Sequence, residues 1–91
     1  MKSRTTRTYW KLFDKLPDDV QQRAKTAFEQ WRENPHAAAL QFKCVSDREA
    51  LYSVRVGLRW RALGYRDDAA DEVTITWFWI GSHAEYDGLI G

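Results

Sequence analysis

The sequence is short of several residue types, and each shortage narrows what the chain can be. Cys44 is the only cysteine, so no disulfide can form within the chain. A lone thiol is typical of a reducing compartment, and we expect the cytoplasm. No apolar run approaches the roughly 20 residues of a membrane-spanning helix. The N-terminal ten residues also lack the apolar stretch of a secretory signal, so we expect a protein without a membrane segment.

Motifs for bound metals and cofactors are missing as well. His36, His83 and Cys44 show none of the spacings that hold a metal, such as Cys-x-x-Cys or His-x-x-x-His. The sequence has no glycine-rich phosphate loop and no nucleophile elbow. We therefore expect no metal site and no cofactor.

Positive charge is absent from the C-terminal part of the chain. All 14 Lys and Arg lie within residues 1–66, whereas residues 67–91 contain six of the acids and no Lys or Arg. This asymmetry indicates a basic surface for an anionic partner. The alternative is a solvated surface on which the two kinds of charge meet in the fold.

Two helices are predicted in the first third of the chain. Residues 9–16 carry apolar side chains at helical spacing. Pro17 ends this pattern, because the residue before a proline avoids helical backbone angles. The second helix, at about residues 19–33, shows the same periodicity and stops before Pro35. An Asp-x-x-Gln sequence at residues 18–21 has the spacing of a capping box at its start.

Three or four strands follow the helices. Residues 40–43 are a short candidate strand. Residues 52–56 alternate in polarity, and residues 59–65 return antiparallel after a two-residue Gly57-Leu58 turn. Residues 73–80 are apolar on both faces at their end, as in a central strand.

This order of elements predicts a single α+β domain over residues 1–91. Two N-terminal helices pack on one face of a small, three- to four-stranded antiparallel sheet. The apolar fraction of 44% and five tryptophans supply the core of such a domain. Residues 3–8 are a further candidate for an edge strand.

Three arginines at alternate positions form the first candidate site. Alternate residues of a strand share a face, so Arg59 and Arg61 lie together, and the hairpin brings Arg55 beside them. Guanidinium groups are the side chains best suited to phosphate oxygens. The other interpretation is an exposed polar sheet face whose arginines pair with Asp or Glu.

His83 and Tyr86 follow the last strand and add chemistry to the arginine face. Histidine titrates near neutrality, so His83 can exchange protons with a substrate. The phenol of Tyr86 can donate to a phosphate, and its ring can stack on a base. Alternatively, His83 is a surface or capping residue and Tyr86 closes the edge of the core.

Aromatic residues are concentrated on the last predicted strand, at Trp77, Phe78 and Trp79. They could form a platform for stacked bases. In a small domain such residues are more often core, and we expect them to pack with Trp31 and Trp60.

Six segments spread over nearly the whole chain form a set that is more specific than any one of them. They are Leu16-Pro17 before a helix, Trp31 to Pro35 at its end, Leu40-Gln41-Phe42-Lys43, Tyr52 to Gly57, Trp60-Arg61-Ala62-Leu63, and Trp79 to Tyr86. Together they resemble the toxins of the RelE/ParE superfamily, from bacterial type II toxin–antitoxin modules. The resemblance implies a RelE-like fold of two helices on a small antiparallel sheet.

The resemblance also implies a function. The RelE-like branch cuts mRNA on the ribosome, so the expected activity is that of an endoribonuclease (mRNA interferase) that arrests translation and growth. Such cleavage activates a ribose 2′-OH against its own phosphate, and it needs a base, positive charge around the phosphorane and an acid. The alternatives are a ParE-like inhibitor of DNA gyrase without nuclease chemistry, and a degenerate member that only binds an antitoxin.

By resemblance, four residues take catalytic roles. Arg55 and Arg61 fall where the family has basic residues on two neighbouring strands, and both would hold the phosphate. His83 lies where the branch has a C-terminal basic residue or histidine and would be the acid–base group. Tyr86 would assist as a donor or as a stacking surface.

Lys43 and Arg59 are further candidates for contact with RNA. The sequence departs from the pattern of active nucleases at Ser53, where they often have another basic residue, and in its acidic C-terminal part. The implied partners are a small cognate antitoxin, whose helix or arm would cover the sheet and basic face, and mRNA on the ribosome or, in the alternative, DNA gyrase.

Overall fold

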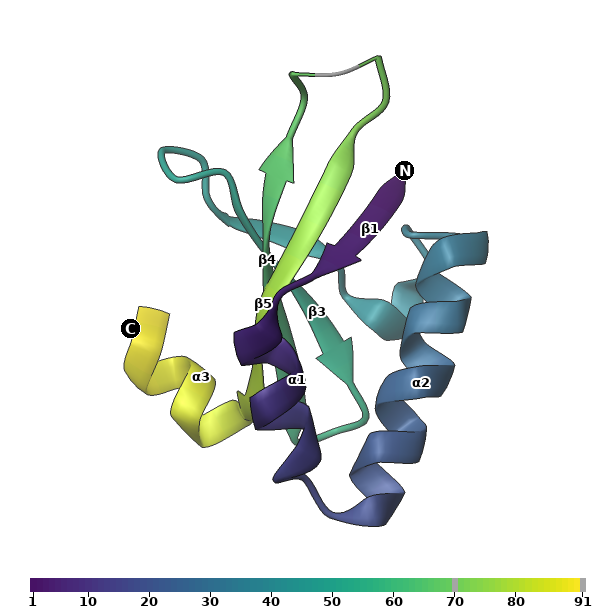
Figure 1. Ribbon diagram of the computed structural model, residues 1–91, viewed down its shortest axis with the longest axis vertical. Helices are drawn as coiled ribbons and strands as arrows, with labels where there is room; N and C mark the ends of the chain where they lie inside the picture. Colours follow the sequence, from purple (N-terminus) through teal and green to yellow (C-terminus); the bar gives the residue numbers. More distant parts are fainter. Residues whose placement is uncertain (70, 91) are drawn as a thin grey trace.

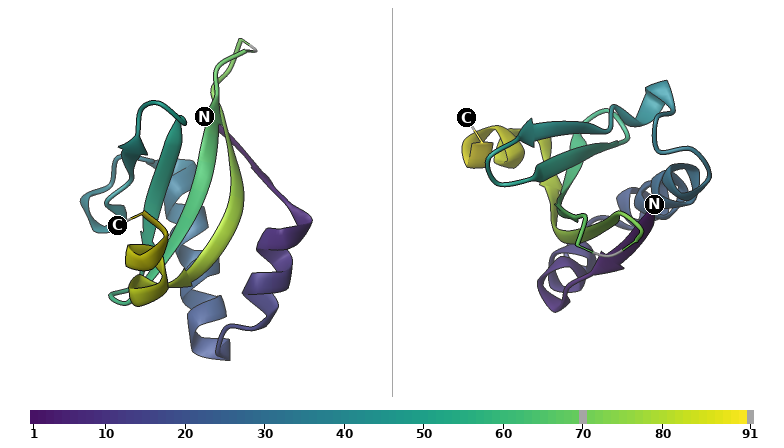
Figure 2. Two further views of the ribbon diagram at one scale, coloured as in Figure 1. Left: turned by 90° about the vertical axis from the view of Figure 1, so that its left-hand side faces the viewer. Right: turned by 90° about the horizontal axis from the view of Figure 1, so that it is seen from above.

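The fold is a twisted sheet with two helices on one face and a third, C-terminal helix on the other (Figures 1 and 2). It is seen in a computed structural model that describes residues 1–69 and 71–90. The elements are β1 (Lys2–Thr5), α1 (Arg7–Asp14), α2 (Asp18–Glu33), the 3₁₀ helix η1 (Ala38–Leu40), β2 (Lys43–Ser46), β3 (Leu51–Val56), β4 (Trp60–Asp67), β5 (Thr74–Ser82) and α3 (His83–Ile90).

The sheet has five strands in the order β1-β5-β4-β3-β2. The last four strands of the chain form the predicted antiparallel meander, whereas β1 pairs in parallel with β5, from Lys2 opposite Thr74 to Thr5 opposite Trp77. The predicted α+β class, with its first two helices on one face, is therefore confirmed. The predicted sheet was too small, because all four residues of β1 are exposed and show no apolar alternation.

The two N-terminal helices lie close to their predicted positions, but one predicted cap is wrong. At α1, the Thr6 side chain accepts a hydrogen bond from the Tyr9 N–H at 3.1 Å and caps the helix. At α2, the N-cap is Pro17 and no side chain caps the helix. The Gln21 amide instead donates to the carbonyls of Phe13 and Leu16, so it fastens α2 to the end of α1.

The main core lies between α1, α2 and the sheet. Trp31 and Trp77 are fully buried, and their ring centroids are 5.6 Å apart in an edge-to-face arrangement. Trp60 packs partly buried against this core, as expected. Tyr9 is also buried here, and burial raises its pKa because the phenolate is disfavoured away from water.

A second apolar cluster lies on the opposite face of the sheet, under α3. It contains Leu51, Leu63 and Tyr86, with Phe78 and Trp79 packed against it. The bulge between Leu63 and Gly64 shifts the register of β4 against β5. The prediction that the aromatic residues of the last strand are core is confirmed for Trp77. Phe78 and Trp79 pack against the second, smaller cluster instead.

Two predicted strand boundaries are wrong. Residues 38–40 form η1, and Gln41 then adopts a left-handed backbone with φ 45° and ψ 43°, so that β2 begins only at Lys43. The β3–β4 hairpin has a three-residue turn, since Val56 pairs with Trp60. Gly57 has φ +64° in this turn, a backbone region that side chains disfavour.

No helix in the described part of the chain is both long and apolar enough to cross a membrane.

Candidate functional site

The candidate site lies on the sheet face that carries α3, opposite the main core. Val54, Val56 and Ala62 point into that core. Arg55 and Arg61 alternate with them along β3 and β4, so they lie on the other face. The register places these two arginines directly opposite each other. The predicted juxtaposition of Arg55 and Arg61 on one face is therefore present in the fold.

Arg61 is the central residue of this site. It is only 6% exposed, and its Cζ lies 5.4 Å from the centroid of the Tyr86 ring. Nη2 donates to the Gln41 side-chain oxygen at 2.9 Å. Within the described chain, Nε and Nη1 have no hydrogen-bond partner, and Arg61 is in none of the ion pairs. A buried cation without a counter-charge is costly, and an anion that reached it would be bound strongly.

Tyr86 joins Arg61 to the C-terminal helix. The residue is 4% exposed, and its hydroxyl lies 3.4 Å from the Ser53 hydroxyl oxygen, which accepts a long hydrogen bond from it. The ring forms part of the second apolar cluster and covers one face of the guanidinium. The alternative that Tyr86 closes the edge of a core is therefore confirmed, and its ring also contacts Arg61. A role of Tyr86 toward a phosphate or a base stays a prediction.

His83 lies at the outer edge of Tyr86. The two ring centroids are 5.8 Å apart at an interplanar angle of 62°. Nδ1 of His83 lies 3.1 Å from Oδ2 of Asp87, and the His83 side chain is 45% exposed. The structure thus brings Arg61, Tyr86 and His83 into one contiguous row that runs from the buried face of the sheet to solvent.

The helix that carries His83 was missed by the sequence analysis, although the sequence contains its start signal. Ser82 and Glu85 form a capping box. The Glu85 carboxylate accepts from the Ser82 N–H, and the Ser82 hydroxyl accepts from the Glu85 N–H, both at 3.1 Å. The cap makes His83 the first residue of α3, so His83 and Tyr86 lie one turn apart on the same side of the helix.

Gly81 keeps space open beside Arg61. It is the residue of β5 directly opposite Arg61. A Cβ atom at Gly81 would lie 2.5 Å from Cζ2 of Trp79 and 3.2 Å from the Glu85 carboxylate. The absence of a side chain therefore lets the Trp79 ring and the start of α3 approach the arginine row.

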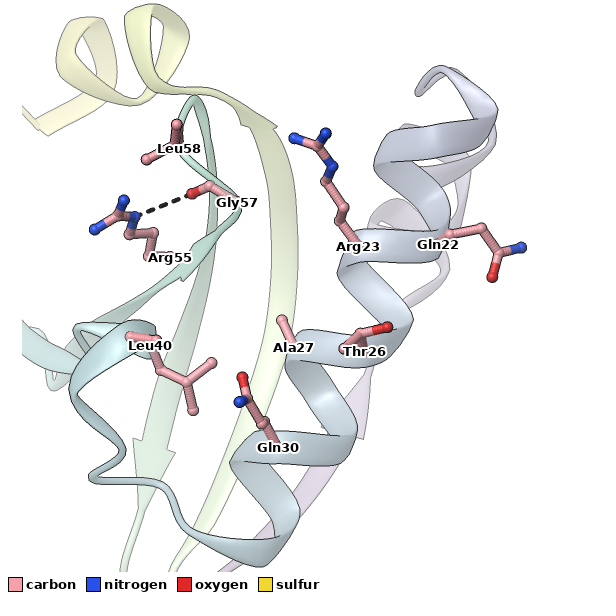
Figure 3. A pocket seen from close by; sticks show the side chains of 10 residues that line it. Gln22, Arg23, Thr26, Ala27, Gln30, Leu40, Arg55, Gly57 and Leu58 are labelled. Carbon is pink, nitrogen blue, oxygen red and sulfur yellow. Dashed lines mark hydrogen bonds between the residues drawn. The ribbon is translucent and has the colours of Figure 1, made fainter.

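The other predicted residues lie around this row. Nε of Arg55 donates to the Gly57 carbonyl at 3.1 Å, so its guanidinium is turned toward the hairpin end (Figure 3). Arg59 lies in the hairpin turn and not in β4, so the predicted strand alternation with Arg61 is wrong. Its carbonyl accepts from the His83 N–H. Lys43 is exposed on β2, opposite Ser53.

A cleft of about 440 Å³ lies between α2 and the β3–β4 hairpin, and Arg55 is among the residues that line it. Arg23 extends from α2 toward the hairpin, whereas Arg55 points away from α2, and Gly57 lies between them (Figure 3). Leu40 and Ala27 form its apolar floor. The cleft is therefore separate from the row formed by Arg61, Tyr86 and His83.

Residues suited to metal binding do not converge in the described structure, where no three His, Cys, Asp or Glu side chains form a possible ligand set. The Cys44 thiol donates to Asp47 at 3.1 Å. This hydrogen bond raises the pKa of the Cys44 thiol and lowers its reactivity.

Comparison with known proteins shows that the chain is similar to toxin domains. Residues 18–88 match the model of a family described as the ParE-like toxin domain. No curated protein is significantly similar in sequence.

Three solved structures resemble the fold over most of their length. A YoeB/ParE toxin from Agrobacterium tumefaciens is 14% identical, with a TM-score of 0.66 over 91% of this chain and 99% of that one. A chain of the RelBE2 toxin–antitoxin complex from Mycobacterium tuberculosis is 22% identical, with a TM-score of 0.67 over 89% and 95%. A chain of the RelB-RelE antitoxin–toxin complex from Methanococcus jannaschii is 15% identical, with a TM-score of 0.68 over 97% and 99%. At these identities the likeness shows a shared fold.

Proposed function

Because this chain belongs to the ParE-like toxin domain family and is a toxin of the toxin–antitoxin type, we propose that it is an endoribonuclease that cuts mRNA and arrests translation. The observation that supports this proposal is that Arg61 is buried and has no ion-pair partner in the described chain. A fold that buries a guanidinium without a carboxylate partner favours an anionic ligand at that point. The phosphate of an RNA backbone is such a ligand.

The chemical roles that we propose for Arg61, Tyr86 and His83 follow from their positions between the buried face of the sheet and solvent. Arg61 would stabilise the charge that develops on the phosphorane. His83, at the solvent end, would take the proton of the ribose 2′-OH as its oxygen attacks phosphorus, and would then return a proton to the 5′-oxygen that leaves. If Nδ1 of His83 holds its proton toward Asp87, Nε2 is the nitrogen free to face the substrate. Tyr86, which is buried, would hold the guanidinium in place, and Arg55 would add positive charge from the neighbouring strand.

The experiment is inducible expression of the full chain in a bacterium, followed by mapping of mRNA 5′ ends. We expect new 5′ ends within translated messages for the parent chain. His83→Ala should reduce their number by roughly 10²- to 10⁴-fold, the usual contribution of a general acid–base group. Arg48→Met, which removes an exposed cation in the β2–β3 turn, is the control and should cut like the parent.

A second candidate function, inhibition of DNA gyrase through surface contacts, is favoured by a specific observation. The Tyr86 hydroxyl points toward Ser53 inside the second cluster, and α3 leaves Arg61 only 6% exposed. A phosphate therefore reaches Arg61 only if α3 shifts. Growth arrest with DNA-damage signalling and no new mRNA ends would support this function and contradict the first. Expression without growth arrest would contradict both and leave a chain that only binds its antitoxin.

The proposed partner in each case is a small cognate antitoxin. Two of the similar solved structures are complexes of a toxin with an antitoxin. We propose that an antitoxin segment with acidic residues covers the face of Arg55, Lys43 and Arg59, none of which is in an ion pair within the described chain. Action on mRNA or on gyrase places the protein in the cytoplasm.

A further inference from the structure

Among the residues that the structure describes, Gln41 is the single side chain that holds Arg61 by a hydrogen bond. It lies between η1 and β2, 20 residues before Arg61 in the chain, and its Oε1 accepts from Nη2 at 2.9 Å. The Tyr86 ring contacts the same guanidinium from its face. Arg61 is therefore fixed at one nitrogen and one face, while Nε and Nη1 keep their N–H groups without a partner in the described chain.

The backbone at Gln41 is unusual for this residue type. Its φ of 45° and ψ of 43° lie in the left-handed region, which glycine and asparagine adopt at lower cost. Gln41 is exposed and is not part of either apolar cluster, so packing does not account for its side chain. The hydrogen bond to Arg61 is the contact that a glycine or asparagine at this position would lack.

The chemical type of Gln41 decides what the contact does. A carboxylate at 2.9 Å would pair with the guanidinium and cancel the charge that a phosphate needs. An amide oxygen accepts the hydrogen bond but is neutral, so the full positive charge stays available. The side chain therefore orients Arg61 without neutralising it.

We propose that Gln41 is a positioning residue that aims the Arg61 guanidinium at the scissile phosphate. This inference rests on the proposed nuclease function. Gln41 itself need not touch the substrate. Its effect passes through the direction of the two Arg61 N–H groups, which are buried without a partner in the described chain and meet the phosphate once α3 has shifted. A guanidinium that is free to rotate in the site would present those groups to the phosphate only part of the time.

Three substitutions at one position separate the possible roles of Gln41. Gln41→Asn keeps the amide and suits the left-handed backbone, but it is one methylene too short to reach Nη2. Gln41→Gly relieves the backbone and removes the contact. Gln41→Glu keeps the reach and the acceptor but adds a negative charge. The matched control is Gln22→Asn, the same shortening at an exposed position of α2.

The first measurement is single-turnover cleavage of a translated mRNA by the purified chain. We expect Gln41→Asn and Gln41→Gly to lower the rate about 10- to 100-fold, as expected for a misplaced catalytic group, with little change in KM. Both variants should be as resistant to urea as the parent or more so. Gln41→Glu should be slower still and bind RNA more weakly, and Gln22→Asn should match the parent. Parent-like rates for Asn and Gly would overturn the inference.

The second measurement does not depend on nuclease activity. The ¹⁵N-edited NMR signal of the Arg61 Nε–H should be sharp in the parent and broadened in Gln41→Asn and Gln41→Gly. Inorganic phosphate should shift this signal in the parent and fail to shift it in Gln41→Glu. If the parent does not cut RNA but these NMR changes occur, the proposed function is wrong while the positioning role of Gln41 holds. A signal that is identical in all variants overturns the positioning role alone.

Discussion

The guanidinium of Arg61 lies against the ring of Tyr86, with Cζ 5.4 Å from the ring centroid. One residue comes from the middle of the sheet and the other from the C-terminal helix. The position of α3 therefore decides how far the Arg61 guanidinium is buried. Substitutions at and around this contact distinguish its role in packing from its proposed role in the chemistry.

The Tyr86 ring should matter more for stability than its hydroxyl. Tyr86→Phe removes only a long hydrogen bond to Ser53, so the free energy of unfolding should fall by about 1 kcal/mol or less. Tyr86→Ala empties the second apolar cluster and should cost roughly 3–5 kcal/mol. Urea unfolding of the two variants measures the difference, and equal losses would contradict this assignment.

Arg61 should be dispensable for folding. Arg61→Met replaces a buried cation that lacks an ion-pair partner in the described chain with an apolar side chain of similar length. Stability should be unchanged or rise by up to about 4 kcal/mol. mRNA cleavage should nevertheless be lost, as scored by 5′-end mapping. A variant that unfolds would show that the charge is structural.

Gly81 and Gly88 should respond to alanine in opposite directions. The new methyl group at Gly81 would collide with the Trp79 ring, and Gly81→Ala should cost about 1–3 kcal/mol. At Gly88, on α3, an added Cβ would meet no other part of the described chain within 4 Å. Gly88→Ala should stabilise the protein by about 0.5–1 kcal/mol, because alanine favours the helix. Thermal unfolding of both variants checks the pair.

The capping box should control the order of α3. Ser82→Ala removes the acceptor of the Glu85 N–H and should destabilise the helix by about 0.5–2 kcal/mol. Hydrogen exchange at the amides of residues 85–90 should speed up, while the amides of α2 keep their protection. If exchange in α3 is unchanged, tertiary packing of Tyr86 alone holds the helix.

Alkaline pH should destabilise the fold through Tyr9. Burial raises the pKa of Tyr9 in the folded state above its value in the unfolded chain, near 10. Below that pH both states are protonated and stability is complete. At higher pH the unfolded chain ionises first, so stability falls as pH rises above about 10. Tyr9→Phe should weaken this fall, as measured by thermal unfolding between about pH 8 and pH 11.

The parts of the fold that were predictable are those with local periodicity. The apolar face of α2 and the alternation along β3 belong to single elements and bury one side, so the sequence displays them. β1 was only a weak candidate, predicted as an edge strand at residues 3–8, because it is exposed along its length and is held by backbone pairing to β5. α3 was predictable from its capping box, which the sequence analysis overlooked.

The candidate site was predictable in its residue types and not in its contacts. The predicted hairpin placed Arg55 beside Arg61 on one face, and the structure agrees. The hydrogen bond from Arg61 to Gln41 joins residues 20 positions apart, and Gln41 makes it from a left-handed backbone conformation. No local sequence pattern predicts this contact. The burial of Arg61 under Tyr86 depends in the same way on a helix docked from a distant part of the chain.

The parallel pairing of β1 with β5 has a consequence for synthesis. The first strand of the chain finds its partner only in the last one, and α3 follows directly after that partner. The nascent polypeptide therefore lacks both the β1–β5 pair and the His83–Tyr86 row until β5 and α3 have been synthesised. Until then, β1 has no partner strand and the sheet face that carries Arg61 has no helix over it.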